Sequence, residues 1–277
     1  MRVRAGVAAA GAAWAWRPRP PVPVRWVRTN FRGRQVDLRE GPSVAGAILL
    51  GVCAAGLPAR ETVGALVAVG AASGAGLLDD WVGETRIKGL RGHLRALTRG
   101  EVTTGIAKIL LIGAGALAGA AVAASAPAHK SGTRRSEAPW RAGAEIGLDA
   151  AVIALAAHVF NLLDLRPGRA LKAVAPPAAA LAAARGPAAP VAAAALGAAV
   201  AAAPADLAER TMLGDCGAAG LGAALGVAGA RHLSANAKVG VVAFLLAVTA
   251  ASERVSFSEV IARHPALARL DAWGRRP

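Results

Sequence analysis

Apolar residues in this chain come in long runs, and short polar stretches rich in arginine, proline or glycine separate the runs. Runs of this kind are typical of helices that are apolar on every side. Several are shorter than the about 20 residues that cross a bilayer, so those would borrow flanking residues or lie tilted. The pattern predicts an all-α fold, a polytopic transmembrane helix bundle of about nine spans, near residues 5–16, 42–57, 61–78, 104–126, 144–163, 170–185, 187–204, 217–230 and 236–252.

The first apolar run follows Arg2 and Arg4, an arrangement that signal peptides share. No clear cleavage site follows the run, whereas many further apolar runs do. We therefore expect a retained first span. Trp14 and Trp16 near its end suit the boundary of a membrane, where the amphipathic indole ring prefers to lie.

Composition narrows the class of protein. Hydrophobic residues make up 55% of the 277 positions and the mean hydropathy is +0.45, which is too apolar for an ordinary soluble domain. The net charge of +15 could indicate nucleic acid, but almost no aromatic residues lie among the arginines for base stacking. Loops held by anionic lipid explain the charge better, so we expect no nucleic-acid partner. Cys53 and Cys216 match neither a metal site nor a disulfide framework, and Cys53 is expected in the core.

The polar stretches fall on two sides, because successive spans alternate in direction. With residues 17–41 in the cytoplasm, the alternation places four further segments there, namely 79–103, 164–170, 205–216 and 253–277. The first two cytoplasmic segments are rich in Arg and Lys, although residues 130–141 on the outer side are basic as well. The sequence predicts a multi-pass protein of the cell inner (plasma) membrane whose active face is cytoplasmic.

The last residues differ from the rest of the chain. We divide the chain into a transmembrane domain, residues 1–253, and a cytoplasmic C-terminal amphipathic tail, residues 254–277. A serine, Ser256 or Ser258, is a candidate helix cap, and apolar residues recur at helical spacing at Leu267, Leu270 and Trp273. The tail is predicted to be a helix on the membrane surface or against a partner, or a solvated helix without a special role.

Two adjacent carboxylates, Asp79 and Asp80, close one of the apolar runs, and Asp164 and Asp215 have similar positions later in the chain. Carboxylates are costly at a bilayer boundary, so they call for a functional reason. The alternation of spans places all four on one face, among Arg and Lys. Carboxylates that bind Mg²⁺ and bases that hold phosphate suit phosphoryl chemistry. The alternative is that each acid merely ends a helix or pairs with a neighbouring arginine.

Four stretches of the chain carry a resemblance to a known family. They are Asn30-Phe31-Arg32-Gly33, Gly76-Leu77-Leu78-Asp79-Asp80, Asn161-Leu162-Leu163-Asp164 and Met212-Leu213-Gly214-Asp215-Cys216-Gly217. In this order they resemble motifs of the polyprenyl-phosphate N-acetylhexosamine-1-phosphate transferases (glycosyltransferase family 4). That family includes phospho-N-acetylmuramoyl-pentapeptide transferase and the undecaprenyl-phosphate GlcNAc-1-phosphate transferases. The resemblance covers roughly residues 25–250 and identifies the chain as a divergent member.

The resemblance implies a reaction and roles for the acids. The family transfers a sugar 1-phosphate from a UDP-sugar to a polyprenyl phosphate with Mg²⁺ and releases UMP, in bacterial cell-envelope glycan biosynthesis such as that of peptidoglycan. By position, Asp215 would be the main Mg²⁺ ligand, and Asp164 would support the metal or the nucleotide. Asp79 and Asp80 would position or deprotonate the lipid phosphate.

The resemblance also supplies candidate substrate-binding residues. Lys108 would neutralise pyrophosphate, or it is a side chain that snorkels from a helix end. Asn161 would orient a phosphate or a carboxylate, and Asn30 belongs to the matching first loop. His158 replaces a polar residue of the family one turn before Asn161, and His93 lies in a basic loop where it could contact phosphate. Both histidines have the alternative of being satisfied or solvated.

The chain departs from the family pattern at several polar positions. Pro167 stands where the family has a second acid, Leu165 where it has a glycine, Ala218 where it has a serine and Ile112 where it has a glutamine. No His-rich loop precedes the final spans. These changes remove groups that handle the nucleotide sugar, so they predict a different substrate, or weak or absent activity.

Three functions stay open on the sequence. The first is the Mg²⁺-dependent transferase, with polyprenyl phosphate, a UDP-sugar and the membrane as partners and a possible homodimer. The second is a catalytically inactive relative that binds lipid phosphate or serves as a scaffold in envelope assembly. The third is a small transporter, for which acids inside the spans are expected, and only Asp149 and Glu145 are candidates.

Overall fold

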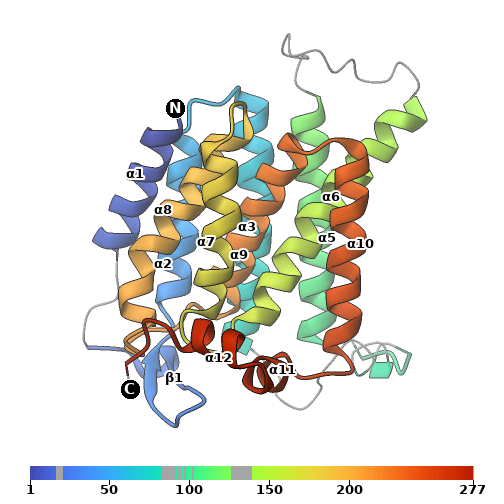
Figure 1. The fold of residues 1–277 in the computed structure, drawn as a ribbon. Coiled ribbons are helices and arrows are strands. Elements are labelled where there is room, and N and C mark those ends of the chain that lie inside the picture. The colour runs from blue at the N-terminus through green and yellow to red at the C-terminus, as the bar shows by residue number, and fades with distance from the viewer. Residues whose placement is uncertain are drawn as a thin grey trace.

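A computed structural model of the chain describes residues 1–16, 21–82, 92, 95–96, 98–101, 103–125 and 139–276. Its described parts are almost entirely helical, as predicted, and they form one bundle (Figure 1). Each of the predicted apolar runs coincides with one helix. These helices are α1 (Arg2–Ala15), α2 (Glu40–Cys53), α3 (Ala59–Val82), α5 (Thr104–Ala124), α6 (Pro139–Leu163), α7 (Arg169–Ala183), α8 (Ala188–Asp206), α9 (Gly214–His232) and α10 (Ala235–Ser252).

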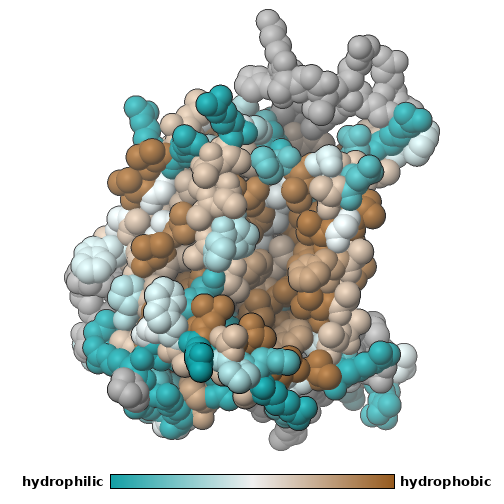
Figure 2. Space-filling view, in the orientation of Figure 1, coloured by the Kyte–Doolittle hydropathy of each residue, from teal (hydrophilic) through white to brown (hydrophobic). Residues whose placement is uncertain are grey.

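Five helices, α3, α5, α6, α8 and α10, are long and apolar enough to cross a membrane. Figure 2 shows the matching surface, with apolar side chains over the middle of the helices and polar side chains at both ends. The nine predicted spans are not confirmed. Length explains three of the four remaining helices: α1 and α2 have 14 residues and α7 has 15, and at about 1.5 Å per residue these fall short of a hydrocarbon core of about 30 Å. Helix α9 has 19 residues but is not among the five helices that are apolar enough.

Helix α9 lies at the centre of the bundle, where every residue from Cys216 to Ala230 is buried. It packs against α2, α3, α6, α7 and α8. Alanine and glycine allow this because they keep neighbouring backbones close. At Gly76 of α3, a Cβ atom would lie 2.2 Å from the carbonyl oxygen of Asp215, so only glycine fits there.

Helix α10, in contrast, is largely exposed. Among the helices of the described part it packs mainly on α6, and Val239, Phe244 and Leu246 are exposed. An apolar face of this kind suits contact with lipid.

The alternating helices bring polar segments from across the sequence to one end of the bundle, as the sequence predicted (Figure 1). A one-turn helix, η1 (Val24–Trp26), and a short antiparallel hairpin, β1 (Val27–Thr29) and β2 (Gln35–Asp37), lie there and were not predicted. We call this end the hairpin end. An isolated bridge between Asp37 and Thr211 ties the hairpin to the segment before α9.

The C-terminal tail forms two short helices, α11 (Phe257–Arg263) and α12 (Pro265–Ala272), where a single helix was predicted. Ser256 caps α11 by accepting a hydrogen bond from the Glu259 N–H at 3.5 Å. Pro265 then separates the two helices, because the residue before a proline avoids the helical conformation, and His264 is extended.

One core assignment was wrong. Cys53 ends α2 and is exposed, whereas Cys216 is buried. The predicted basic stretches at 17–19, 86–91 and 130–135, and His93, lie outside the described residues.

Candidate active site at the hairpin end

Asp80 fixes the start of the central helix. One carboxylate oxygen accepts a hydrogen bond from the Asp215 N–H at 3.1 Å, and the other accepts one from the Cys216 N–H at 2.9 Å. A negative charge is favourable at a helix N-terminus, where backbone N–H groups lack partners within the helix. Gly214 enters α9 with a φ of +63°, which glycine adopts without strain. Asp80 therefore holds the first turn of α9 in place, with one oxygen on Asp215 and the other on Cys216.

Three other side chains converge on a single cation, Lys108. The ammonium of Lys108, from α5, lies 3.2 Å from Asp79 Oδ2 of α3 and forms an ion pair with Asp215 of α9. With its amide oriented to satisfy both neighbours, Asn161 of α6 accepts from Lys108 Nζ at 2.8 Å and donates to Asp215 Oδ1 at 3.0 Å. The Lys108 side chain is only 11% exposed. We call Asp79, Lys108, Asn161 and Asp215 the four-helix cluster.

The local sequence explains how Lys108 reaches this position. Thr103 caps α5 and accepts a hydrogen bond from the Ile106 N–H at 3.3 Å. Lys108 follows about one turn later, so its long side chain can extend toward the helix end. Lys108 is thus part of a network of side-chain contacts with Asp79, Asn161 and Asp215.

Asp164 lies just beyond the C-terminal end of α6 and is buried. Burial raises the pKa of its carboxyl well above the ordinary value, and the nearby carboxylates of Asp206, Asp215 and Asp80 raise it further, against a hydrogen bond from the Gly214 backbone. Its Oδ2 has no hydrogen-bond partner among the described residues. Asp164, directly after α6, therefore favours its neutral, protonated form.

The first loop also contacts the site. Arg28 donates to the carbonyl oxygen of Asp80, and Trp26 packs against Trp81 with ring centroids 5.7 Å apart. The Arg25 guanidinium lies 5.8 Å from the centroid of the Trp81 ring, within reach of a cation–π interaction. These contacts fix the end of α3, which carries both Asp79 and Asp80.

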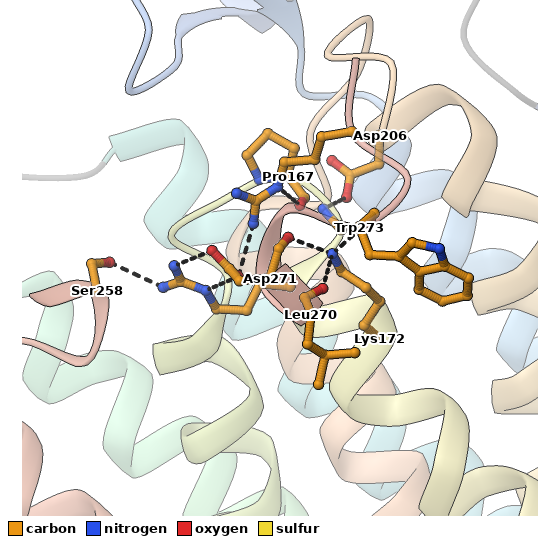
Figure 3. A network of polar contacts seen from close by, with 10 residues as sticks. Pro167, Lys172, Asp206, Ser258, Leu270, Asp271 and Trp273 are labelled. Carbon is orange, nitrogen blue, oxygen red and sulfur yellow. Dashed lines mark hydrogen bonds and ion pairs between the residues drawn. The ribbon is translucent and has the colours of Figure 1, made fainter. Parts of the chain in front are cut away.

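The segment after Asp164 is held by the C-terminal tail (Figure 3). Arg169 forms two hydrogen bonds with Asp271, at 2.7 and 3.0 Å, and Lys172 donates to backbone carbonyls of the tail. Arg275 donates to the Pro167 carbonyl at 2.8 Å. Asp206, at the end of α8, accepts from the Gly168 N–H at 2.7 Å. The tail thus lies against its own chain.

The pKa of Asp271 reflects this docking. Burial alone would raise it, but the hydrogen bond from Arg169 and the charges of Arg169 and Arg275 outweigh burial and lower it below the ordinary value. Sequence reasoning missed Asp206, Arg169 and Asp271. Asp206 had a usable signal, because it follows an apolar run in the same way as Asp79.

Asn30 and His158, two further predicted site residues, do not join the four-helix cluster within the described residues. Asn30 donates to Glu209 at 2.7 Å and accepts from the backbone N–H groups of Arg32 and Arg34, so it builds the hairpin turn. His158 is half-buried one turn before Asn161, and no hydrogen bond joins it to the cluster in the part of the chain that is described. His93 lies outside the described residues.

The donor atoms of the cluster are those that Mg²⁺ prefers, namely carboxylate and amide oxygens. However, no three His, Cys, Asp or Glu side chains within the described ranges form a group suited to a metal ion. The oxygens of Asp79, Asp215 and Asn161 instead meet at the Lys108 ammonium. The donor chemistry fits Mg²⁺, but an ion bound by Asp215 at this point would require Lys108 to move.

Of the four positions that depart from the family pattern, Leu165 is exposed, whereas the other three make packing or backbone contacts. Ala218 and Ile112 are buried, and the Pro167 carbonyl is engaged by Arg275. These residues stabilise the bundle and the loop and add no side-chain polar group to the cluster.

Comparison of the chain with protein-family models, with curated proteins and with solved structures found no match.

Proposed function

We propose that this protein is a membrane transferase that moves a sugar 1-phosphate from a UDP-sugar to a polyprenyl phosphate and releases UMP. The observation that supports the proposal is the four-helix cluster, in which two acids, an amide and a lysine from distant parts of the sequence meet at one polar end of an apolar bundle. A water-soluble nucleotide sugar and a lipid phosphate can meet only at such a boundary.

In this proposal each residue of the site has a distinct role. Lys108 neutralises the charge that develops on the pyrophosphate as the phosphoryl group transfers. Asp79 orients the lipid phosphate, or accepts its proton, while Asn161 keeps Asp215 and Lys108 aligned. Asp80 acts as a positioning residue through the N-terminus of α9. When bound, Mg²⁺ would supply further neutralisation of the diphosphate, with Asp215 as its ligand.

The proposed orientation places the hairpin end in the cytoplasm, with the five long apolar helices, α3, α5, α6, α8 and α10, crossing the inner membrane. Basic residues of the first loop support it, since Arg28, Arg32 and Arg34 lie at this end and cytoplasmic loops are rich in such residues. The UDP-sugar would then arrive from the cytoplasm.

The test is an assay of purified protein in detergent with polyprenyl phosphate, Mg²⁺ and a panel of UDP-sugars, followed by UMP release. We expect release with at least one sugar, and a loss of about 100-fold or more in Asp79→Asn and Asp215→Asn, because each removes a charge from the reacting centre. Glu259→Gln, an exposed tail acid, is the matched control and should keep wild-type activity. Absence of UMP release with every sugar would refute the transferase.

A second candidate is a relative that binds polyprenyl phosphate without transfer and assists envelope assembly. It is favoured by the Lys108 ammonium at the meeting point of the oxygen donors and by the packing roles of Ala218 and Pro167. The same preparation separates the two candidates, because this one predicts lipid-phosphate binding that Lys108→Met abolishes, with no UMP release. The transporter gains no comparable support, since Asp149 is paired with Lys238 and Glu145 is exposed.

A further inference from the structure

A second polar site lies apart from the four-helix cluster. A cavity of about 420 Å³ opens between the ends of α1, α2 and α8, at the lower ends of these helices in Figure 1. Its volume falls in the range of pockets that take small organic molecules or head groups. No residue of the four-helix cluster lines it, so it needs an explanation of its own.

Two buried polar side chains, Glu40 and Thr211, lie beside each other at the floor of the cavity. Glu40 is 3% exposed and Thr211 is 6% exposed, and both line the cavity. Within the described residues, Glu40 Oε2 and Thr211 Oγ1 make no hydrogen bond. Buried polar atoms nearly always have a partner, so these two oxygens indicate a ligand that donates hydrogen bonds.

The other acid and hydroxyl of the floor are already engaged. Asp37 is paired with Arg39 at 2.7 Å, and Ser43 donates toward the carbonyls of Trp16 and Arg39, each at 2.9 Å. Glu40 is therefore the carboxyl that a ligand would address. A ligand that donates hydrogen bonds satisfies its open lone pair, and a cationic donor also stabilises the ionised form of this buried carboxyl.

The backbone holds this floor in a preformed shape. The Asp37 N–H donates to the Arg210 carbonyl at 3.1 Å, and the Met212 N–H donates to the Asp37 carbonyl at 3.0 Å. These bonds fix Thr211 beside the end of β2. A preformed site loses less free energy to ordering when its ligand binds.

The rim of the cavity carries an aromatic ring and a cation instead of acids. Trp14 of α1 is 54% exposed and Arg210 is exposed, and both line the cavity with Val44 and Ala202. A guanidinium suits a phosphate, and an indole ring suits an ammonium group or an apolar chain. The cavity thus offers an acid inside, an aromatic wall and a cation outside.

We propose that this cavity binds the head group of an ethanolamine phospholipid. The ammonium group lies against Glu40 and Thr211, and the phosphate lies at Arg210. The site adjoins the end of α8, which is long and apolar enough to cross a membrane, so a head group would be at the right depth. Exposed Val7 of α1 and Val200 of α8 give the acyl chains an apolar surface. This inference is independent of the proposed transferase activity.

Native mass spectrometry of delipidated protein in detergent tests the proposal by titration with phosphatidylethanolamine. We expect one retained lipid per protein, with binding at least tenfold weaker in Glu40→Gln and in Arg210→Gln. Glu145→Gln, an exposed acid at the other end of the bundle, is the matched control and should bind as wild type. Ala205→Phe, which fills the cavity without changing a charge, should abolish retention.

Two further ligands test separately whether the ammonium group and the acyl chains of the lipid are recognised. Phosphatidylglycerol lacks the ammonium group, and equal retention of it would overturn the contact with Glu40. Soluble phosphoethanolamine lacks the acyl chains, and binding as tight as that of the lipid would overturn the assignment to a membrane lipid. Wild-type retention by folded Glu40→Gln and Ala205→Phe would overturn the site itself, with folding checked by an unchanged thermal transition in the absence of lipid.

Discussion

At the residue scale, Lys108 decides the electrostatics of the candidate active site. Its ammonium is the shared partner of Asp79 and Asp215, and it also donates to the amide oxygen of Asn161. Two carboxylates this close would repel each other without a cation between them. Lys108 is thus both a stabilising group and a group that a phosphate ligand would compete for.

Lys108→Met is expected to destabilise the protein by about 2 to 3 kcal/mol, because it leaves two carboxylates without a partner where they are only partly exposed to water. The thermal transition in detergent measures the effect. We also expect Mg²⁺ to raise the midpoint of the variant more than that of the wild type, since the oxygens of Asp79 and Asp215 become available to it. Lys108→Arg, which keeps the positive charge, is the control and should show a smaller loss. Wild-type stability of Lys108→Met would contradict the network.

At the scale of elements, the contact of α3 with α9 positions the acids. Gly76 permits the approach that lets Asp80 reach the backbone of α9, and the preceding run of small residues continues the contact. The placement of Asp79 and Asp80 thus depends on a residue without a side chain one turn earlier.

Gly76→Ala is expected to lower the free energy of unfolding by about 2 to 3 kcal/mol, because its methyl group would collide with the Asp215 backbone and force the helices apart. Denaturant titration in mixed micelles measures this change. Gly70→Ala, on the same helix, is the matched control, since a Cβ atom there meets nothing within 4 Å. It should be neutral or stabilise by about 0.5 to 1 kcal/mol, as alanine favours a helix. Equal effects of the two substitutions would show that α3 and α9 are not in close contact.

The docking of α11 and α12 should depend on pH through Asp271. Its pKa is lowered in the folded protein relative to about 3.9 in an unfolded chain. The stabilisation is therefore complete above about pH 4 and is lost as the pH falls through the lower folded value. The protection of residues 254–276 against hydrogen exchange, taken relative to the intrinsic rate at each pH, should thus be high at neutral pH and fall only in acid.

The matching variant is Asp271→Asn, in which exchange of the tail should be faster at neutral pH as well, because the charge that pairs with Arg169 and Arg275 is gone. Glu259→Gln, whose partner Arg263 is exposed, serves as the control and should leave exchange unchanged. A tail that exchanges rapidly in the wild type at neutral pH would mean that it is not docked.

At the scale of the whole molecule, the bundle has two polar ends separated by an apolar middle. The hairpin end holds the four-helix cluster, the tail and the cavity with Glu40. The opposite end holds Cys53 and the ion pair of Glu61 with Arg231, at 2.5 Å. This arrangement suits a protein whose ends face different compartments.

Cysteine labelling in sealed vesicles tests that arrangement. Cys53 is exposed and Cys216 is buried, so the wild type should take up one impermeant thiol reagent per chain, at Cys53. In Cys53→Ala/Ser258→Cys, the tail should be labelled only from the other side of the membrane. Labelling of both positions from one side would contradict a bundle that crosses the membrane between them.

Several features of the candidate site could be predicted from sequence. Acids that flank apolar runs, such as Asp79 and Asp215, can be found in the linear sequence. The alternation of helices then places them at a common end. The hydrogen bonds of Asp80 with α9 could not be foreseen, because they depend on how closely two helices approach. Asn30 shows the converse case, since a motif match placed it in the site, whereas it accepts hydrogen bonds within its own hairpin turn and donates to Glu209.

The sequence by itself determined the helices and their polar ends, because apolar runs and their proline or charged boundaries are local properties of the chain. Only the tertiary structure decided which side chains share a partner. The rotation of each helix about its axis and the long-range docking of the tail bring Lys108 to Asp79 and Asp215, and Arg169 to Asp271. They also leave Glu40 and Thr211 buried at an open cavity, since burial without a partner follows from the packing of neighbouring elements and not from any one segment.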